Sequence, residues 1–286
     1  MATLREIRRR LTSIQSTQQI TRAMKMVAAV KLRRAQEKIL RARPYAYRLN
    51  EVLGHVASLM NGSGHPLMAI REPRRVCYVV VTSDRGLCGA FNSNIIRKAI
   101  HEIQAHKDSE VSLIAVGKKG RDYLQKHNYP LIAQYADFFD ELGFQHAQEI
   151  AGKVIQLYSN QEVDLVCFIY NEFKSAVQQR LVTEQLLPII PLLPREEKRW
   201  MSYLYEPSPE AILGVLCPKQ INIQVWRVLL ESNAAEQGAR MTAMEMATNN
   251  AQEMIQQLTL YYNKVRQAII TKEISEIVGG AEALKK

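Results

Sequence analysis

The chain has 286 residues, of which 47% are hydrophobic, and a formal net charge of +10. This length fits one large domain or one domain with an extension, and the apolar content suffices for a packed core, which excludes wholesale disorder. The apolar runs are short and broken by charge or proline, so no transmembrane helix of about twenty residues is predicted. The N-terminus lacks the apolar core of a secretory signal, and the four cysteines form no CxxC pair, so we expect an intracellular chain with reduced thiols.

The first stretch, from Leu4 to Met60, is predicted to form one long helix. Its small and apolar residues alternate at spacings of three and four, which is the pattern of a coiled-coil seam. The seam positions are Leu4, Ile7, Leu11, Ile14, the polar Gln18, Thr21 and Lys25, and then Ala28, Leu32, Ala35, Ile39, Ala42, Ala46, Leu49, Leu53, Val56 and Met60. A polar break of this kind loosens a seam or sets its register. Pro44 is expected to bend the helix or to mark a boundary near Arg43.

Most of the positive charge lies on this first helix. Residues 1–48 contain thirteen Lys and Arg but only two Glu, a net charge of +11, so the rest of the chain is close to neutral. A helix this basic favours an acidic groove, a nucleic acid or an anionic surface as its neighbour. The alternative is a solvated basic helix in an ordinary bundle.

The middle of the chain alternates between strand and helix patterns. Strands are predicted at Val76–Thr82, Val111–Val116, Leu131–Tyr135 and Val163–Tyr170, with Val177–Leu187 pairing back onto the last of them. Helices are predicted from about Asn92 to His106, Lys118 to His127 and Gln145 to Ser159. This alternation is typical of a Rossmann-like α/β sheet with helices on both faces. A flexible link at residues 61–66 and a proline-marked extended exit between Pro188 and Pro209 flank this region.

The last stretch, from about Ile221 to Leu284, is predicted to be a second long helix. Its stripe at spacings of three and four consists of Met244, Ala247, Ala251, Ile255, Leu258, Tyr262, Val265 and Ile269. A helix of about 64 residues spans on the order of 95 Å, so it needs a partner helix. We therefore expect an α/β protein with three parts: a coiled-coil helix at 1–60, a Rossmann-like domain at 75–195 and a coiled-coil helix at 209–286.

Two glycine-containing turns are candidates for phosphate binding. The loop at residues 83–92 contains Gly86 and Gly89, and Gly117 and Gly120 follow the second strand. Neither matches the GxGxxG or GxxxxGK[ST] spacing. Because tight strand-to-helix turns need glycine whether or not a ligand binds, the structural interpretation is favoured.

Other candidates for chemistry are weak. Cys88 lies near a helix start, which could lower its pKa, but no pattern nominates a histidine partner. Asp137, Asp140 and Glu141 could supply paired carboxylates, although the DFFDE sequence fits a polar turn with aromatic anchors more simply. No metal-ligand spacing is present. The sequence therefore predicts no catalytic, cofactor-binding or metal site.

Three stretches closely resemble the γ subunit of F-type ATP synthases. They are residues 20–31, beginning ITRAMKMVA, residues 83–92, beginning SDRGLCG, and residues 231–281, which include ESN, ARMTAM and GGA. The resemblance covers the whole chain in order and length. It departs from the family pattern at Ala90, where a glycine is frequent, and at Pro218, which suggests a kink or a restart of the last helix.

The resemblance implies a rotor shaft. The terminal helices would form an antiparallel left-handed coiled coil, whose upper part would lie inside a ring of three α and three β subunits. The α/β domain would lie outside the ring, near the membrane, against the ε subunit and the c-ring. Proton flow would turn the c-ring and the shaft, which would drive ATP synthesis on β and help to regulate ATPase activity and proton flow. The chain itself would be non-catalytic, without a cofactor or nucleic acid, and peripheral at the cytoplasmic face of the inner membrane.

The resemblance also nominates residues of the zone that contacts β. They are Met24, Lys25, Arg240, Gln267, Thr271 and Glu273. We expect Met24 to pack close to Gln267 or Thr271 across the coil. The stretch from Leu187 to Pro209 contains no cysteine, so we expect a bacterial type without the redox insertion of chloroplast γ subunits.

Two alternatives come from other classes of protein. A basic coiled-coil protein that binds nucleic acid would account for the first helix and predicts steeply salt-dependent DNA affinity. A Rossmann-type enzyme with helical arms predicts nucleotide binding by the isolated chain.

Overall fold

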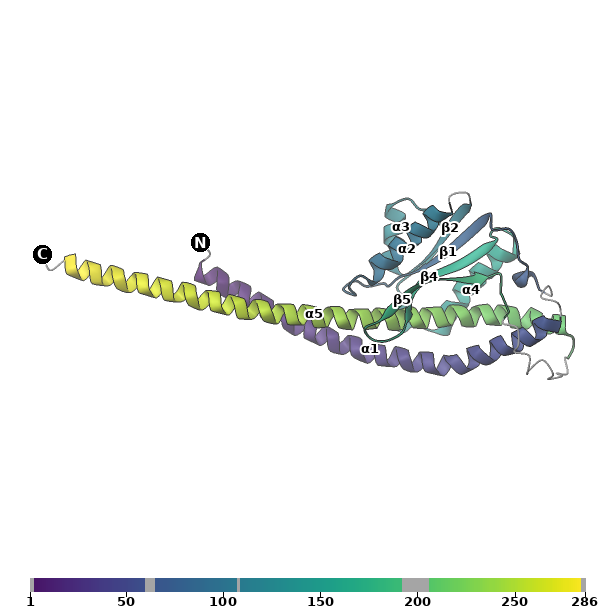
Figure 1. Cartoon of the computed structure of the whole chain (residues 1–286), viewed down its shortest axis with the longest axis horizontal. Coiled ribbons are helices and arrows are strands. Elements are labelled where there is room, and N and C mark those ends of the chain that lie inside the picture. The colour runs from purple at the N-terminus through teal and green to yellow at the C-terminus, as the bar shows by residue number, and fades with distance from the viewer. Residues whose placement is uncertain (1–2, 60–64, 107–108, 192–205, 284–286) are drawn as a thin grey trace. The chain divides into compact units, whose positions relative to one another are not determined.

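The computed structural model describes residues 3–59, 65–106, 109–191 and 206–283 (Figure 1). The chain forms two units. The coil unit comprises Met1–Val27 and Met241–Lys286, and the sheet unit comprises Ala28–Arg240.

Parts of four expectations lie outside the described residues. They are the seam position Met60, most of the link at 61–66, the exit between 192 and 205 together with the absence of a redox insertion there, and the helix end at Leu284. The last two residues of the link are described, and they are structured. The imidazole Nδ1 of His65 accepts a hydrogen bond from the N–H of Leu67 at 3.2 Å and caps the short helix η1, Pro66–Met68.

Two long helices belong to both units. Helix α1 comprises Leu4–Leu59, and helix α5 comprises Pro209–Ala283. Both contain a proline, Pro44 and Pro218, and both continue past it. Of the two alternatives predicted at each proline, the boundary near Arg43 and the restart at Pro218 are therefore wrong, whereas the bend at Pro44 and the kink at Pro218 stay predictions. A proline in a helix interior costs about 3 kcal/mol, and seam residues buried on both sides of it offset that cost.

The burial of side chains along both helices follows the predicted seams. Every predicted seam position of α1 from Leu4 to Val56 is buried or half-buried, and most positions between them are exposed up to Arg48. In α5 the predicted stripe is buried or half-buried from Met244 to Val265, whereas Ile269 is exposed. The three–four spacing therefore identified the packed face of each helix.

The sheet unit contains the predicted five-stranded sheet. The elements are β1 (Arg75–Val81), α2 (Phe91–Ala105), β2 (Glu110–Val116), α3 (Lys118–Lys126), β3 (Leu131–Tyr135), the short helix η2 (Phe139–Glu141), α4 (Phe144–Ser159), β4 (Leu165–Phe173) and β5 (Gln179–Leu187). The strand order is β3-β2-β1-β4-β5; β5 is antiparallel to β4 and the other neighbours are parallel. This confirms the Rossmann-like arrangement and the return of β5 onto β4.

The central strands are continuous runs of apolar, mostly β-branched residues because both of their faces are covered. Right-handed crossovers place α2 and α3 on one face and α4 on the other, as Figure 1 shows. The core on the first face joins side chains of three strands to the helices above them, including Val76, Tyr78, Val80, Phe91, Ile95, Ala99, Leu113, Leu124 and Ile169.

Helix α5 is part of this core and not an appendage to it. Ala235 belongs to the same hydrophobic cluster, and the residues around it from Ala234 to Gly238 are all buried. At Gly238 an added Cβ would lie 2.9 Å from the carbonyl oxygen of Ala176, which follows β4. A glycine is needed there because the helix backbone approaches the β4–β5 turn so closely.

An ion pair ties the start of β1 to the residue before β4. Asp164, only 5% exposed, accepts hydrogen bonds from the backbone N–H, Nε and Nη2 of Arg75, the last at 2.8 Å. The hydrogen bonds from Arg75 lower the pKa of the Asp164 carboxyl. A lowered folded-state pKa stabilises the fold above the normal pKa, and this stabilisation is lost as the pH falls through the lowered value.

We predict that Asp164→Asn lowers the free energy of unfolding by about 1–2 kcal/mol at neutral pH, because Arg75 loses its anionic acceptor but remains partly solvated. The difference from the native chain should shrink below about pH 4, where the unfolded-state carboxyl is protonated. Urea denaturation at both pH values measures it. Glu162→Gln, which changes an exposed carboxylate nearby, is the control and should leave stability unchanged. A pH-independent loss in Asp164→Asn would contradict the assignment.

Candidate functional site

The polar break in the α1 seam is where the two helices of the coil unit are hydrogen-bonded to each other. Three pairs cross the seam: Gln18 Nε2 to Gln252 Oε1 at 2.6 Å, the hydroxyls of Thr21 and Thr248 at 2.8 Å, and Lys25 Nζ to Glu245 Oε1 at 2.6 Å. Residue numbers rise along α1 as they fall along α5, so the helices are antiparallel, as expected. The break sets the register, which was one of its two predicted roles.

This register contradicts the expected packing of Met24. Its neighbour Lys25 pairs with Glu245, and Gln267 lies 22 positions further along α5, which is about 33 Å at 1.5 Å per residue. Met24 is half-buried beside the seam residue Lys25, but this register does not bring it to Gln267 or Thr271. Periodicity determines which face of α5 meets α1, but every turn along that face fits the pattern equally well. The sequence pattern therefore does not determine the register, and the hydrogen bonds between the helices show that the expected register is wrong.

The remaining predicted residues of the coil unit lie on an exposed helix. Gln267, Thr271 and Glu273 are all exposed, as are their neighbours from Arg266 to Ala281. The register explains this, because Gln18 opposite Gln252 places the first residues of α1 opposite about residue 267 of α5. Beyond that position α5 runs past the described part of α1 (Figure 1).

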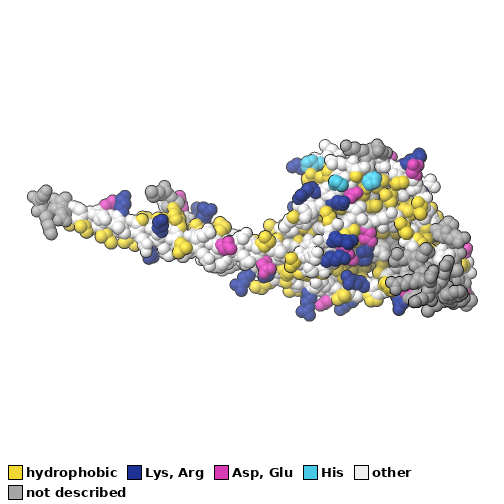
Figure 2. Space-filling view, in the orientation of Figure 1, with side chains coloured by type: hydrophobic (Ala, Val, Ile, Leu, Met, Phe, Trp, Pro, Cys, Tyr) yellow, Lys and Arg dark blue, Asp and Glu magenta, His cyan; other side chains and the backbone are white. Residues whose placement is uncertain are grey.

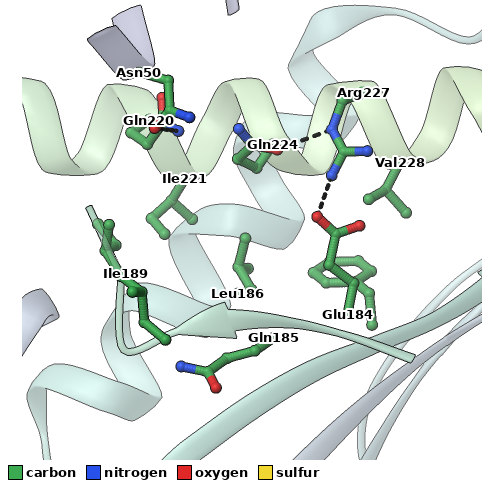
Figure 3. A pocket seen from close by; sticks show the side chains of 12 residues that line it. Asn50, Glu184, Gln185, Leu186, Ile189, Gln220, Ile221, Gln224, Arg227 and Val228 are labelled. Atoms are coloured by element: carbon green, nitrogen blue, oxygen red, sulfur yellow. Dashed lines mark hydrogen bonds and ion pairs between the residues drawn. The ribbon is translucent and has the colours of Figure 1, made fainter. Parts of the chain in front are cut away.

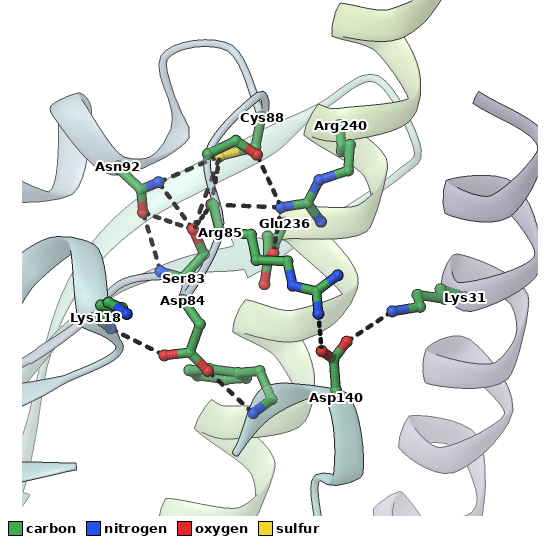
Figure 4. Close-up of polar contacts among 12 residues, drawn as sticks. Lys31, Ser83, Asp84, Arg85, Cys88, Asn92, Lys118, Asp140, Glu236 and Arg240 are labelled. Atoms are coloured by element: carbon green, nitrogen blue, oxygen red, sulfur yellow. Dashed lines mark hydrogen bonds and ion pairs between the residues drawn. The ribbon is translucent and has the colours of Figure 1, made fainter. Parts of the chain in front are cut away.

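Arg240, the sixth predicted residue, lies in the sheet unit and points inward (Figure 4). Its side chain is 12% exposed and donates through Nη2 to Oε1 of Glu236 at 2.6 Å. The same nitrogen donates to the carbonyl oxygen of Gly86 at 3.2 Å. Burial raises the pKa of the Glu236 carboxyl, and the Arg240 guanidinium opposes that shift. Arg240 therefore binds the loop at residues 83–92 to α5.

Asp140, in η2, bridges this loop to α1. Its carboxylate accepts from Lys31 Nζ at 2.8 Å and pairs with Arg85 Nη2 at 2.7 Å. The hydrogen bond from Lys31 lowers the pKa of Asp140. Asp140 therefore serves in an ion-pair bridge and not in the paired-carboxylate site considered above. The phenylalanines beside it are the expected anchors, since Phe138 is buried and stacks on Phe139. We call Lys31, Arg85, Asp140, Glu236 and Arg240 the loop cluster.

The loop itself is held by its own polar side chains. Ser83 N–H donates to Oδ1 of Asn92 at 3.0 Å, and Nδ2 of Asn92 donates to Sγ of Cys88 at 3.3 Å. The Cys88 side chain is 2% exposed and packs in the core, so burial raises its pKa. The lowering of this pKa that a helix start can produce is outweighed by desolvation, which agrees with the structural interpretation of Cys88.

The helix that follows the second strand has no backbone donors free for a phosphate in its first turn. Its first three N–H groups are taken: Lys118 donates to Asp84 Oδ1 at 2.9 Å, Lys119 to the Ser83 carbonyl at 3.0 Å and Gly120 to Thr82 Oγ1 at 2.8 Å. The Asp84 carboxylate thus occupies the position that an anion would take at α3. The glycines serve packing: Gly117 has φ +92°, and a Cβ there would lie 2.3 Å from the Thr82 carbonyl oxygen.

A second polar group surrounds Arg227 of α5, beside a cavity of about 160 Å³ (Figure 3). Arg227 pairs with Glu184 of β5 and Glu231 of α5, and it donates to the Tyr170 hydroxyl at 3.2 Å. Burial raises the pKa of Glu184, but hydrogen bonds from Arg227 and Tyr170 bring it below its normal value. The two charged groups that line the cavity, Glu184 and Arg227, are thus paired with each other. Charged groups held in an ion pair of this kind are unsuited to acid–base catalysis.

Sequence reasoning missed most of these polar partners. The spacing of Glu236 and Arg240 by four positions on a helix was a visible signal for their pairing. Asp84, Glu184 and Arg227 find partners far along the chain, which no local spacing announces. Within the described residues, no group of three or more His, Cys, Asp or Glu is arranged to hold a metal ion.

The four cysteines are unpaired and buried, in agreement with the expectation of reduced thiols. None of the helices in the described ranges contains a stretch long and apolar enough to span a bilayer.

We predict that Gly117→Ala destabilises the chain by at least about 2 kcal/mol, because the new methyl group meets the Thr82 backbone at a positive φ. Gly152→Ala is the matched control, since that glycine lies in α4 with no atom within 4 Å of an added Cβ. It should stabilise the chain by up to about 1 kcal/mol. Thermal denaturation compares the two variants. Equal stability of Gly117→Ala and the native chain would reopen a ligand-related role for this glycine.

We predict that the variant Thr21→Cys/Thr248→Cys forms a disulfide on oxidation, because the two hydroxyl oxygens are 2.8 Å apart. Met24→Cys/Gln267→Cys should not, since that pair belongs to the rejected register. The native cysteines are buried and do not compete. Gel mobility with and without a reductant distinguishes the variants. A disulfide only in the second variant would restore the register expected from the resemblance.

Comparisons with known proteins agree with this architecture. A family model described as ATP synthase matches residues 3–284. The chain is 53% identical to the ATP synthase gamma chain of Chlorobaculum parvum and 51% identical to that of Pelotomaculum thermopropionicum, with complete coverage of both chains in each case.

Solved structures give the same result. A chain of the Tetrahymena thermophila mitochondrial ATP synthase central stalk and c-ring matches with a TM-score of 0.61 and 29% identity, over 80% of this chain and 99% of that one. A chain of the Euglena gracilis mitochondrial enzyme matches in fold, with a TM-score of 0.70 and 22% identity over 98% of this chain and 94% of that one. The chain therefore belongs to the ATP synthase gamma chain family.

Proposed function

We propose that the chain is the central rotor shaft of an F-type ATP synthase. In this role it turns with a c-ring, and the turning shaft drives ATP synthesis at active sites that lie on β subunits. The paired helices of the coil unit supply the contacts with the ring of α and β subunits, and the sheet unit supplies the contacts with the c-ring and an ε subunit.

One observation carries this proposal, the exposed C-terminal stretch of α5. Its apolar side chains are open to solvent, with Ile270 43%, Ile274 55%, Ile277 71% and Val278 56% exposed. Figure 2 displays hydrophobic side chains along this part of the chain. Exposed apolar residues in series on one helix mark contact with another chain. A ring of three α and three β subunits that encloses the helix is the partner we infer.

The charges on the coil unit suit a contact that must break and re-form. Arg5, Arg8, Arg9 and Arg10 are all exposed near the start of α1. Exposed charges attract acidic loops over short range, and each pair contributes only about 0–1 kcal/mol. A rotating surface needs many contacts of this weak kind, because a strong fixed contact would stall it.

We assign no catalysis, cofactor or nucleic acid to this chain. The charged residues beside the cavity are neutralised, and the first turn of α3 has its backbone donors occupied. We place the chain at the cytoplasmic face of the inner membrane, as a peripheral subunit that meets the membrane only through the Fo sector.

The proposed contacts with β involve five of the six residues nominated from the sequence. They are Met24, Lys25, Gln267, Thr271 and Glu273. For Arg240 we propose a different role, the retention of the loop at 83–92, because its guanidinium is buried against Glu236 and the loop carbonyls.

Reconstitution with α and β subunits tests the proposal, with ATP hydrolysis assayed in the presence and absence of this chain. We predict assembly at one copy per three αβ pairs and a higher multi-site turnover. A chain that stays outside the ring but binds DNA with a steep salt dependence would instead favour the nucleic-acid alternative. Nucleotide binding by the isolated chain would favour the Rossmann-type enzyme.

A further inference from the structure

We propose that the sheet unit grips α5 at Arg227 and Arg240, so that α5 carries the torque, whereas α1 is held beside the unit by a lysine clasp that opens and closes. The mechanical part of this inference rests on the proposed function. The difference between the two attachments is a property of the fold alone.

The first grip is at Arg240. Its ion pair with Glu236 is almost completely buried, the two side chains being 12% and 5% exposed. Because Glu236 belongs to the same helix, it holds the guanidinium in place, and the guanidinium reaches the carbonyls of Arg85 and Gly86. Separation from the loop would leave buried donors without acceptors, which makes this attachment costly to break.

The second grip is at Arg227. Its guanidinium connects α5 to two strands, through Glu184 of β5 and the hydroxyl of Tyr170 in β4. The Tyr170 hydroxyl also donates to Glu184 at 2.6 Å, so each of the three side chains contacts the other two. A bound guanidinium with several acceptors resists both sliding and twisting of the helix that carries it.

The two grips act on different sides of the helix. Arg227 and Arg240 are thirteen positions apart, which is about 20 Å along α5 and roughly 140° around its axis. Between them, the backbone at Gly238 lies against the Ala176 carbonyl. Two attachments with this offset oppose rotation of α5 relative to the sheet, which is the motion that torque would produce.

The attachment of α1 is of another kind. Between Ala28 and Arg48, the polar contacts from α1 to η2 and the residue after it are those of Lys31 with Asp140 and of Lys38 with the Leu142 carbonyl, the latter at 3.2 Å. Lys31 and Asp140 are 43% and 50% exposed, so their pairing is weak and screened by salt. We call Lys31 and Lys38 with these two acceptors the lysine clasp.

The Lys31–Asp140 pair of the clasp opens at little cost because neither charged group is left buried and unpaired. Asp140 retains Arg85 as a partner when Lys31 leaves, and the lysine regains water. The seam residues Leu32, Ala35 and Ile39 remain buried when the clasp opens, as do Leu53 to Ala57 at the end of α1. Opening therefore releases only the polar attachment of the middle of α1 to η2, which lets this stretch move more within its seam while α5 remains fixed to the sheet unit.

Spin-label distance measurements on the full chain test this. One label pair joins α1 to α3, through Arg34→Cys and Lys126→Cys, and another joins α5 to α3, through Lys219→Cys and Lys126→Cys; all three positions are exposed and the native cysteines are buried. We predict that Lys31→Ala/Lys38→Ala broadens the α1–α3 distance distribution by about twofold and leaves the α5–α3 distribution unchanged.

The matched control is Arg33→Ala/Glu37→Ala, which removes an exposed ion pair contained within α1. It should leave both distributions unchanged. The inference is overturned if the clasp variant leaves the α1–α3 distribution as it was, or if it broadens the α5–α3 distribution to the same extent.

The reconstituted complex provides the second measurement. Lys31→Ala/Lys38→Ala should retain ATP-driven proton transport within about twofold of the native chain. Arg240→Lys should lower it severalfold at unchanged assembly, because an ammonium group does not reproduce the fork of a guanidinium. The reverse order of effects would identify α1 as the torque-bearing helix. Failure to assemble would speak against the proposed function, while the spin-label result would stand by itself.

Discussion

The pairing of α1 with α5 is the constraint on which the rest of the structure depends. Each helix presents a stripe of small and apolar side chains that must be covered, and most of the stability of a helix in a protein comes from packing of this kind. Mutual coverage satisfies both. It also explains the small residues, since Ala28, Ala35 and Ala251 are buried where the helices face their neighbours.

Helix α5 also contributes to the hydrophobic core of the sheet unit. A five-stranded sheet with helices on both faces would be complete without a long terminal helix, yet Ala235 of α5 belongs to its core. The helix is therefore folded into the domain along one part and paired with α1 along another.

The candidate site was only partly visible in the sequence. The loop at 83–92 and the helix stretches around Lys31 and Arg240 were recognised as distinctive, and ion pairs and hydrogen bonds of the loop cluster bring them into contact. Their partners were not anticipated. Asp140 appeared to be one of several acidic residues in a turn, and its function as a bridge depends on Lys31 and Arg85, which lie far from it in the sequence.

Local chemistry in the sequence determined the elements of this protein, because a three–four spacing, a β-branched run or a strand-to-helix glycine acts within a few residues. It determined the seam of each helix, the strand that returns onto β4 and the absence of phosphate-loop spacing. The tertiary structure alone decided the register of the coil, the inward direction of Arg240 and the high pKa of Cys88. Each of these depends on which distant groups come into contact, and a repeating pattern is compatible with many such contacts.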